Sequence, residues 1–242
     1  MATFVLVHPT MLGGWCWGPL RRELEREGHR VLAPSLTGLG DRAHLAGPDV
    51  GLSVHIQDIA RLIRWEDLHD VILVGSSYGG MVITGVAGVV PERLAHLVYL
   101  DAFRPSPGQS AFAQLPVLVD VFGDPPAETP WSWPVFEDLA PLGLADPDQV
   151  AWVKQRATPM PVLTHREPLP APERLPEGPA VPATYVRAAA SPFFAEVGEQ
   201  AERDGLSLLT WQGAGHLLPI LETDRVAALL RRIAAGRAEA SG

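Results

Sequence analysis

Short apolar runs alternate with longer amphipathic stretches along most of the chain. The apolar runs predict strands over residues 3–7, 30–34, 71–75, 94–100, 183–187 and 207–211. The amphipathic stretches predict helices over residues 15–27, 53–66, 78–89, 193–204 and 222–235. Strands that are buried on both faces are apolar throughout, and their alternation with helices is typical of parallel sheets. We therefore predict an α/β fold with a mostly parallel central sheet that helices cover on both faces.

Residues 104–182 interrupt this alternation. The segment is crowded with prolines, and its large aromatic residues include Trp131, Trp133, Phe136 and Trp152. A long irregular insertion in a compact domain is usually a functional lid or a disordered linker. Aromatic side chains argue against disorder because they need a surface to pack on. We therefore predict a core made of residues 1–103 and 183–242, and a cap, residues 104–182, over the active site.

Composition and charge narrow the function classes. Hydrophobic residues make up 47% of the 242 residues and charged residues 19%, which indicates a globular protein. The net charge is −9 and the basic residues are scattered, so we expect no nucleic-acid partner. Cys16 is the only cysteine, which excludes an internal disulfide and a cysteine-ligated metal. The expected partner is a small-molecule substrate.

The location of the protein is predicted from its apolar segments. The longest of them, residues 81–90, is too short to cross a bilayer and contains glycines. No basic segment precedes the apolar run at residues 4–7, so a secretory signal is not expected. We predict a cytoplasmic protein with no membrane partner. The sequence does not fix the oligomeric state, and a homodimer is compatible with it.

The pentapeptide Gly75-Ser76-Ser77-Tyr78-Gly79 follows an apolar run and precedes a predicted helix. This context is the one that a G-x-S-x-G nucleophile turn requires, because the strand, sharp turn and helix expose the serine hydroxyl. Counting two residues from each flanking glycine selects Ser77 as the nucleophile, and Ser76 occupies the variable position. The Tyr78 N–H, directly after the nucleophile, is the first expected oxyanion donor.

A serine hydroxyl needs a base within hydrogen-bond reach. His216 lies in a small-residue loop just after the last predicted strand, and in this fold order the base comes last. Other histidines lie in polar or helical settings, where a solvated surface position is expected: His29, His44, His55, His69, His96 and His165.

The loop after the first strand is expected to supply the second oxyanion donor. Pro9 has no N–H, so the donor is Thr10 or a later residue, and we choose Thr10. His8, which ends the strand, is expected to hold this loop by hydrogen bonds rather than to act in catalysis.

Four segments together carry a family resemblance: residues 8–17, 37–42, 75–83 and 97–103. They resemble the bacterial branch of the α/β-hydrolases that is related to plant methylesterases and hydroxynitrile lyases. The similarity extends over nearly the whole chain and weakens in the cap. It implies a core of six to eight strands, a small cap inserted after the sixth strand, and no cofactor or metal. Family members mostly cleave esters of small acids, some cleave cyanohydrins, and some bacterial relatives modify polyketide-type metabolites.

The acid of the expected triad departs from the family pattern. In plant members it follows the penultimate strand, where this chain has Ser191. Asp101, which ends the predicted strand at 94–100, lies at the same edge of the sheet and has apolar neighbours. A buried carboxylate is seldom left without a partner, so we predict that Asp101 orients His216. The alternatives are that Asp101 only caps the next turn, and that Glu196 is the acid.

The leading hypothesis is a serine-dependent hydrolase of a small carboxylic ester or lactone that acts through an acyl-enzyme. One alternative is a lyase, dehydratase or cyclase acting on a biosynthetic intermediate, with His216 as general base. Another is a non-catalytic small-molecule binder. Hydroxynitrile lyases of this family carry a lysine beside the catalytic histidine, and Leu217 here disfavours that reaction. The candidate substrate-binding residues are Met11, Phe103, Trp131, Trp133 and Leu217.

Overall fold

The computed structural model of the protein describes residues 1–171 and 180–240. Its main sheet has six strands in the order β2-β1-β3-β4-β7-β8, and every pair of neighbours is parallel. The strands are β1 (Thr3–Val7), β2 (Arg30–Leu32), β3 (Val71–Ser76), β4 (Leu94–Leu100), β7 (Ala183–Ala188) and β8 (Ser207–Trp211). The prediction of a parallel central sheet is confirmed. Strand β2 ends two residues before the predicted end at Pro34, which has no N–H for a sheet hydrogen bond.

Helices cover both faces of the sheet. The long ones are α1 (Gly18–Arg26), α2 (Leu52–Trp65), α3 (Gly79–Val89), α8 (Ala195–Arg203) and α10 (Thr223–Ala240). The single helix predicted over residues 15–27 is wrong, because a 3-10 turn, Gly14–Trp17, precedes α1. Pro19 lies at the start of α1, where its missing N–H costs nothing, and this position favours a new helix start. None of the helices in the described ranges is long and apolar enough to cross a membrane.

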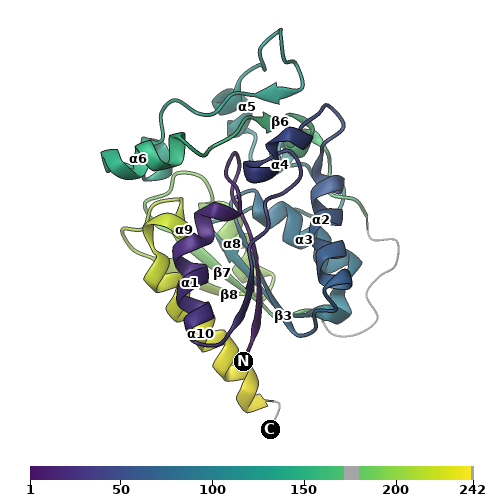
Figure 1. Ribbon diagram of the computed structural model, residues 1–242, viewed down its shortest axis with the longest axis vertical. Helices are drawn as coiled ribbons and strands as arrows, with labels where there is room; N and C mark the ends of the chain where they lie inside the picture. Colours follow the sequence, from purple (N-terminus) through teal and green to yellow (C-terminus); the bar gives the residue numbers. More distant parts are fainter. Residues whose placement is uncertain (172–179, 241–242) are drawn as a thin grey trace.

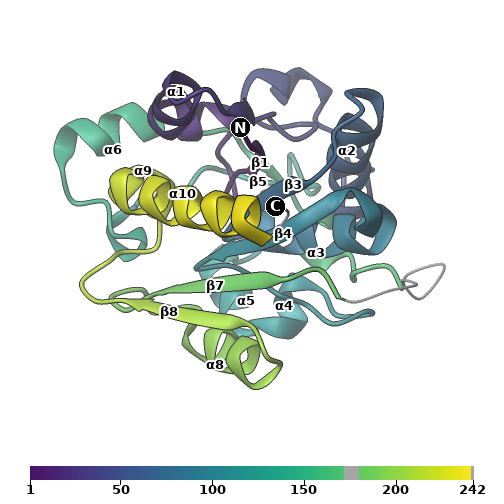
Figure 2. The same cartoon turned by 90° about the horizontal axis from the view of Figure 1, so that it is seen from below.

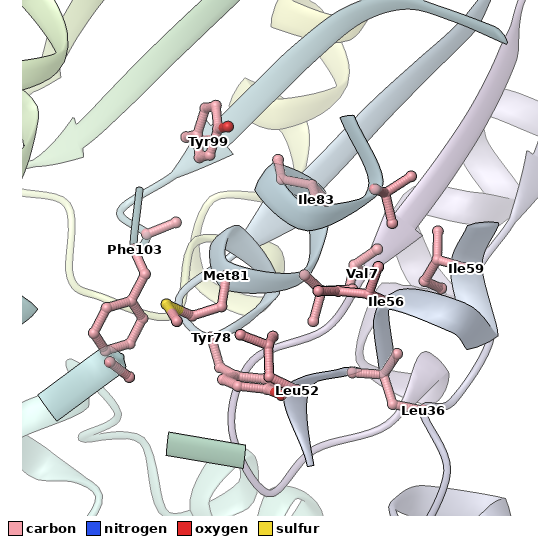
Figure 3. Packing of buried hydrophobic residues seen from close by; sticks show 14 of the residues in the cluster. Val7, Leu36, Leu52, Ile56, Ile59, Tyr78, Met81, Ile83, Tyr99 and Phe103 are labelled. Atoms are coloured by element: carbon pink, nitrogen blue, oxygen red, sulfur yellow. The ribbon is translucent and has the colours of Figure 1, made fainter. Parts of the chain in front are cut away.

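Two hydrophobic cores lie on opposite faces of the sheet. One contains side chains of α2, α3 and α8, among them Ile56, Met81 and Val197. The other contains side chains of α1 and α10, among them Leu20 and Val226. Figure 2 shows α1 and α10 on one side of the strands and α3 and α8 on the other. Figure 3 shows the first core close to the turn that follows β3, where Tyr78 and Met81 pack near Leu52 and Ile56. This packing fixes the start of α3.

Residues 104–182 form an insertion between β4 and β7. Its described elements are short: α4 (Ala111–Gln114), α5 (Val117–Phe122), β5 (Ser132–Trp133), α6 (Pro147–Lys154), β6 (Met160–Pro161) and α7 (Leu163–Arg166). Strands β5 and β6 pair antiparallel as a separate sheet. Figure 1 shows α5, α6 and β6 above the carboxyl ends of the main strands. Because the sheet of the described residues has six strands and two follow the insertion, the insertion lies after the fourth strand rather than after a sixth.

Gly80 in α3 tests how closely this helix approaches the end of β4. A Cβ added at Gly80 would lie 2.0 Å from the Phe103 carbonyl oxygen, whereas one added at Gly47 would meet nothing within 4 Å. Alanine is favoured over glycine in a helix by about 1 kcal/mol, but a forced clash costs about 1–3 kcal/mol or more. We expect Gly80→Ala to lower the free energy of unfolding in urea by about 2 kcal/mol, and Gly47→Ala to leave it nearly unchanged. Equal stability of the two variants would contradict the close approach.

Candidate active site

Neighbouring strands β3 and β4 end at the same level. Ser76 pairs with Leu100, so the next residues, Ser77 and Asp101, leave the sheet side by side. Both have left-handed backbone conformations, with φ of 53° at Ser77 and 43° at Asp101. The Ser77 N–H donates to the Leu100 carbonyl at 3.3 Å, and the Ser77 carbonyl accepts from the Phe103 N–H at 3.1 Å. Such strained residues persist only where the surroundings hold them, and they concentrate at functional sites.

His216 lies on the loop between β8 and α9 (Leu218–Leu221) and joins these two residues. Its Nε2 is 2.9 Å from Ser77 Oγ, and its Nδ1 is 2.7 Å from Asp101 Oδ2. A carboxylate can only accept, so Nδ1 carries the hydrogen and the bare Nε2 accepts from the Ser77 hydroxyl. Phe194 stacks on the imidazole with ring centroids 5.4 Å apart and 12° between the planes. The ring is therefore held in the orientation that both hydrogen bonds need.

Asp101 is fully buried and makes hydrogen bonds through both carboxylate oxygens. Oδ1 accepts from the Ala188 N–H at 3.0 Å, while Oδ2 faces His216. Its own N–H donates to the Val186 carbonyl at 2.7 Å. A carboxylate removed from water needs such partners. Asp101, the residue predicted to be the acid, thus lies beside His216.

Ser191, at the position of the acid in plant members, and Glu196, the alternative acid, lie elsewhere. Ser191 uses its hydroxyl oxygen to accept from the Phe193 N–H at 3.4 Å. Glu196 is exposed in the first turn of α8. Neither has a described contact with His216.

The two expected oxyanion donors lie at the ends of neighbouring elements. Tyr78 immediately precedes α3, whose N-terminus favours negative charge. Thr10 lies on the loop after β1. Within the described part of the chain, neither the Thr10 N–H nor the Tyr78 N–H donates a hydrogen bond. Both donors are therefore free to bind an oxyanion if they face it.

His8 holds the Thr10 loop as the sequence predicts. Its Nδ1 is 2.8 Å from the Pro9 carbonyl oxygen, and its Nε2 is 3.0 Å from the Leu36 nitrogen. Nδ1 donates and Nε2 accepts, which is the pattern of a neutral imidazole. Burial lowers the pKa of His8 to about 4, in agreement with that pattern. His8 therefore stays neutral near pH 7, and its two hydrogen bonds hold the loop.

A cavity of about 50 Å³ opens onto Ser77 and His216. Thr10 lines it too, and so do Phe103 and Leu217, two of the five predicted substrate-binding residues. The other three, Met11, Trp131 and Trp133, do not line it. Met11 is turned into the core below the sheet end. The Trp133 indole N–H donates to the Gly123 carbonyl at 3.0 Å, and its ring is buried within the insertion.

Several residues that line the cavity were not predicted to do so. Four are phenylalanines, of which two lie in the insertion and two directly before α8: Phe122, Phe136, Phe193 and Phe194. The fifth is His165, which was expected at the surface. His55 and His165 are fully buried, so the expectation of solvated side chains is wrong for these two. Three of their four ring nitrogens bond to residues far away in sequence, and local sequence carries no sign of such bonds. The adjacent aromatic pair Phe193-Phe194 is the one feature of the sequence that could have indicated a cavity wall here.

The class of the protein follows from this fold and from a family comparison. The profile of the alpha/beta hydrolase family matches residues 4–229. The chain therefore belongs to the α/β-hydrolase family, as its sequence motifs suggest.

Individual relatives narrow the resemblance. The carbendazim hydrolyzing esterase of Nocardioides sp. (strain SG-4G) is 43% identical over 182 residues, which are 70% of this chain and 73% of the esterase. Methylesterase 1 of Arabidopsis thaliana is 30% identical over 136 residues, 55% of this chain and 50% of the relative. The α-hydroxynitrile lyase of Arabidopsis thaliana is 37% identical over 103 residues, 42% of this chain and 40% of the lyase. The sequence resemblance to esterases thus covers the larger part of the chain.

Two solved structures share the fold. An extracellular α/β-hydrolase from a Paenibacillus species superposes with a TM-score of 0.77 at 24% identity, over 96% of this chain and 99% of that one. Tomato methylketone synthase I superposes with a TM-score of 0.80 at 20% identity, over 97% and 98% of the two chains. At these identities the likeness establishes the fold alone.

Buried neutral histidines make stability depend on pH. Burial lowers the pKa of His8 from 6.5 to about 4 and that of His165 from 6.5 to about 3. The unfolded chain binds protons at these sites below pH 6.5 while the folded chain does not, so acid favours unfolding. Between pH 6.5 and 5 we expect each of the two to reduce the free energy of unfolding by about 2 kcal/mol. Urea unfolding of wild type and His165→Gln at both pH values checks this, because the variant should lose less stability. Identical losses in the two proteins would contradict a neutral buried His165.

Proposed function

We propose that the chain is a serine-dependent hydrolase of a small carboxylic ester or lactone that acts through an acyl-enzyme. The observation that carries the proposal is the unbroken chain of hydrogen bonds from Asp101 through His216 to Ser77, 2.7 and 2.9 Å long. The three groups are buried and come from three separate segments of the chain, and Ser77 and His216 open onto one cavity. The resemblance to esterases supports hydrolysis as the reaction.

In the proposed reaction, Ser77 Oγ attacks the carbonyl carbon of the substrate while its proton passes to His216 Nε2. Asp101 stabilises the imidazolium that forms and keeps Nδ1 protonated throughout. The N–H groups of Thr10 and Tyr78 stabilise the oxyanion of the tetrahedral intermediate. His216 then gives its proton to the leaving alkoxide, which departs as an alcohol. Water, activated in turn by His216, releases the acid and restores the serine.

The walls of the cavity suggest the substrate class. Most of the lining residues are aromatic or aliphatic, and none of those in the described chain is Asp, Glu, Lys or Arg. Burying an unpaired charge against such walls would be costly. We therefore propose an uncharged substrate with a small apolar acyl group. The insertion, residues 104–182, supplies Leu118, Phe122 and Phe136 to these walls and thus acts as a cap. Cytoplasmic location and homodimer formation stay predictions.

The first test removes the nucleophile. Ser77→Ala should lower kcat for p-nitrophenyl acetate by a factor on the order of 10⁶, because neither the triad nor the acyl-enzyme can then operate. Ser76→Ala is the matched control, since its hydroxyl is buried without a partner among the described residues. Spectrophotometric release of p-nitrophenol measures both. Full turnover by Ser77→Ala would exclude the acyl-enzyme mechanism.

The second test asks which carboxylate is the acid. Asp101→Asn should lower kcat roughly ten-thousandfold, because the amide stabilises the wrong tautomer of His216 and no imidazolium. Glu196→Gln changes a carboxylate at an exposed position near Ser191 and should leave kcat unchanged. The same ester assay compares them. A large loss in Glu196→Gln, with Asp101→Asn active, would reassign the acid.

Ser77→Ala and His216→Ala together separate hydrolysis from the alternative reactions. A lyase, dehydratase or cyclase that uses His216 as general base would retain product formation in Ser77→Ala and lose it in His216→Ala. A non-catalytic binder would bind an ester without turnover even as the wild type. Ser77-dependent turnover would exclude both.

A further inference from the structure

We infer that His165, carried by the insertion, is a positioning residue for the oxyanion site. The inference rests on the proposed function. One buried imidazole touches the side chains of both Thr10 and Tyr78, the two residues whose N–H groups would bind the oxyanion. Thr10 and Tyr78 belong to the core, whereas His165 lies on α7. The cap segment therefore contributes to the catalytic geometry as well as to the cavity walls.

Two contacts define the arrangement around His165. Its Nε2 is 3.3 Å from the Thr10 hydroxyl oxygen. Its ring stacks on the Tyr78 ring, with centroids 5.0 Å apart and 19° between the planes. The Tyr78 phenol is fixed at its other end by His55, whose Nδ1 is 2.9 Å from the phenol oxygen. Thr10 and Tyr78 are thus tied together through one ring that lines the cavity beside Ser77.

The hydrogen-bond directions follow from the partners of His165. The Thr164 hydroxyl lies 2.6 Å from the Pro161 carbonyl oxygen, to which it must donate. That hydroxyl oxygen is also 2.8 Å from His165 Nδ1, so it accepts there and Nδ1 carries the hydrogen. In a neutral imidazole Nε2 is then bare and accepts from the Thr10 hydroxyl. Burial lowers the pKa of His165 to about 3, which keeps the ring neutral.

This polarity restrains Thr10 in one orientation. Its hydroxyl hydrogen is committed to His165, so the side chain cannot rotate freely and the backbone of the loop is held with it. The loop has a second tie to the insertion, since the Met11 carbonyl accepts from the Thr158 N–H at 2.9 Å. A shift of a reacting group by about 1 Å can cost a hundredfold in rate. By fixing the position of the Thr10 N–H, His165 therefore contributes to catalysis through Thr10.

A packing role alone does not account for an imidazole at this position. The neighbouring rings are aromatic and apolar: Phe103, Phe112, Phe122 and Trp133. A phenylalanine would fill the same space without the cost of burying two ring nitrogens. Both ring nitrogens of His165 make hydrogen bonds, and Nε2 accepts from the Thr10 hydroxyl.

The experiment compares three variants by their kcat and KM for p-nitrophenyl acetate. His165→Phe keeps the ring and removes the acceptor, and we expect kcat to fall about tenfold to a hundredfold with KM little changed. His165→Gln places an amide oxygen near the Nε2 position and should recover most of the loss. Thr10→Val removes the partner hydroxyl, so combining it with His165→Phe should cost no more than Thr10→Val alone.

Trp133→Phe is the matched control because it alters the same aromatic cluster and leaves the Thr10 contact intact. It should lower Tm without the fall in kcat. Wild-type kcat in His165→Phe, or equal losses of kcat in His165→Phe and Trp133→Phe, would overturn the inference. So would a ¹⁵N NMR spectrum that shows the hydrogen of His165 on Nε2. These results leave the proposed function standing, whereas Ser77-independent turnover would remove the proposed function and this inference together.

Discussion

The proposed catalytic group depends on how two neighbouring parallel strands end. Because Ser76 and Leu100 are in register, the chain leaves β3 and β4 at the same level, each time through a residue with positive φ. That places the Ser77 hydroxyl and the Asp101 carboxylate at one edge of the sheet, within reach of a single imidazole. The left-handed turns cost conformational energy, and the backbone bonds from Ser77 to Leu100 and Phe103 hold the turn in place. Helix α3 also packs closely against this turn, since Gly80 lies directly against Phe103.

Most of the fold follows from local pattern. Apolar runs and amphipathic stretches predict the sheet and its helical layers because each element must bury an apolar face. The glycine-flanked Ser77 and the late His216 are local motifs with few structural alternatives. Asp101 could be suggested because a carboxylate among apolar residues needs a partner, and a strand end in a parallel sheet restricts where that partner lies. Its role as the acid stays a prediction, although its Oδ2 lies 2.7 Å from His216.

Several of the residues that line the cavity, and the contacts of His165 behind it, could not be predicted from local sequence pattern. Trp131 and Trp133 are predicted to line the pocket because they are aromatic residues of the insertion, but neither does, because their positions depend on how its short elements pack on one another. His165 looks like a surface histidine because its partners, Thr10 and Tyr78, are far away in sequence. Met11 lies next to the proposed oxyanion donor, yet its positive φ turns it into the core. In each case long-range contacts decide the environment of the side chain.

The central claim is that the Ser77 hydroxyl is the group activated for attack on an acyl centre. Reaction of the folded chain with an alkyl fluorophosphonate, followed by mass spectrometry of the peptide that contains Ser76 and Ser77, measures this without knowledge of the substrate. We predict a single phosphonyl group on Ser77, and slower labelling when Asp101 is replaced by Asn. Modification of Ser76 instead, or no modification of the folded chain, would contradict it.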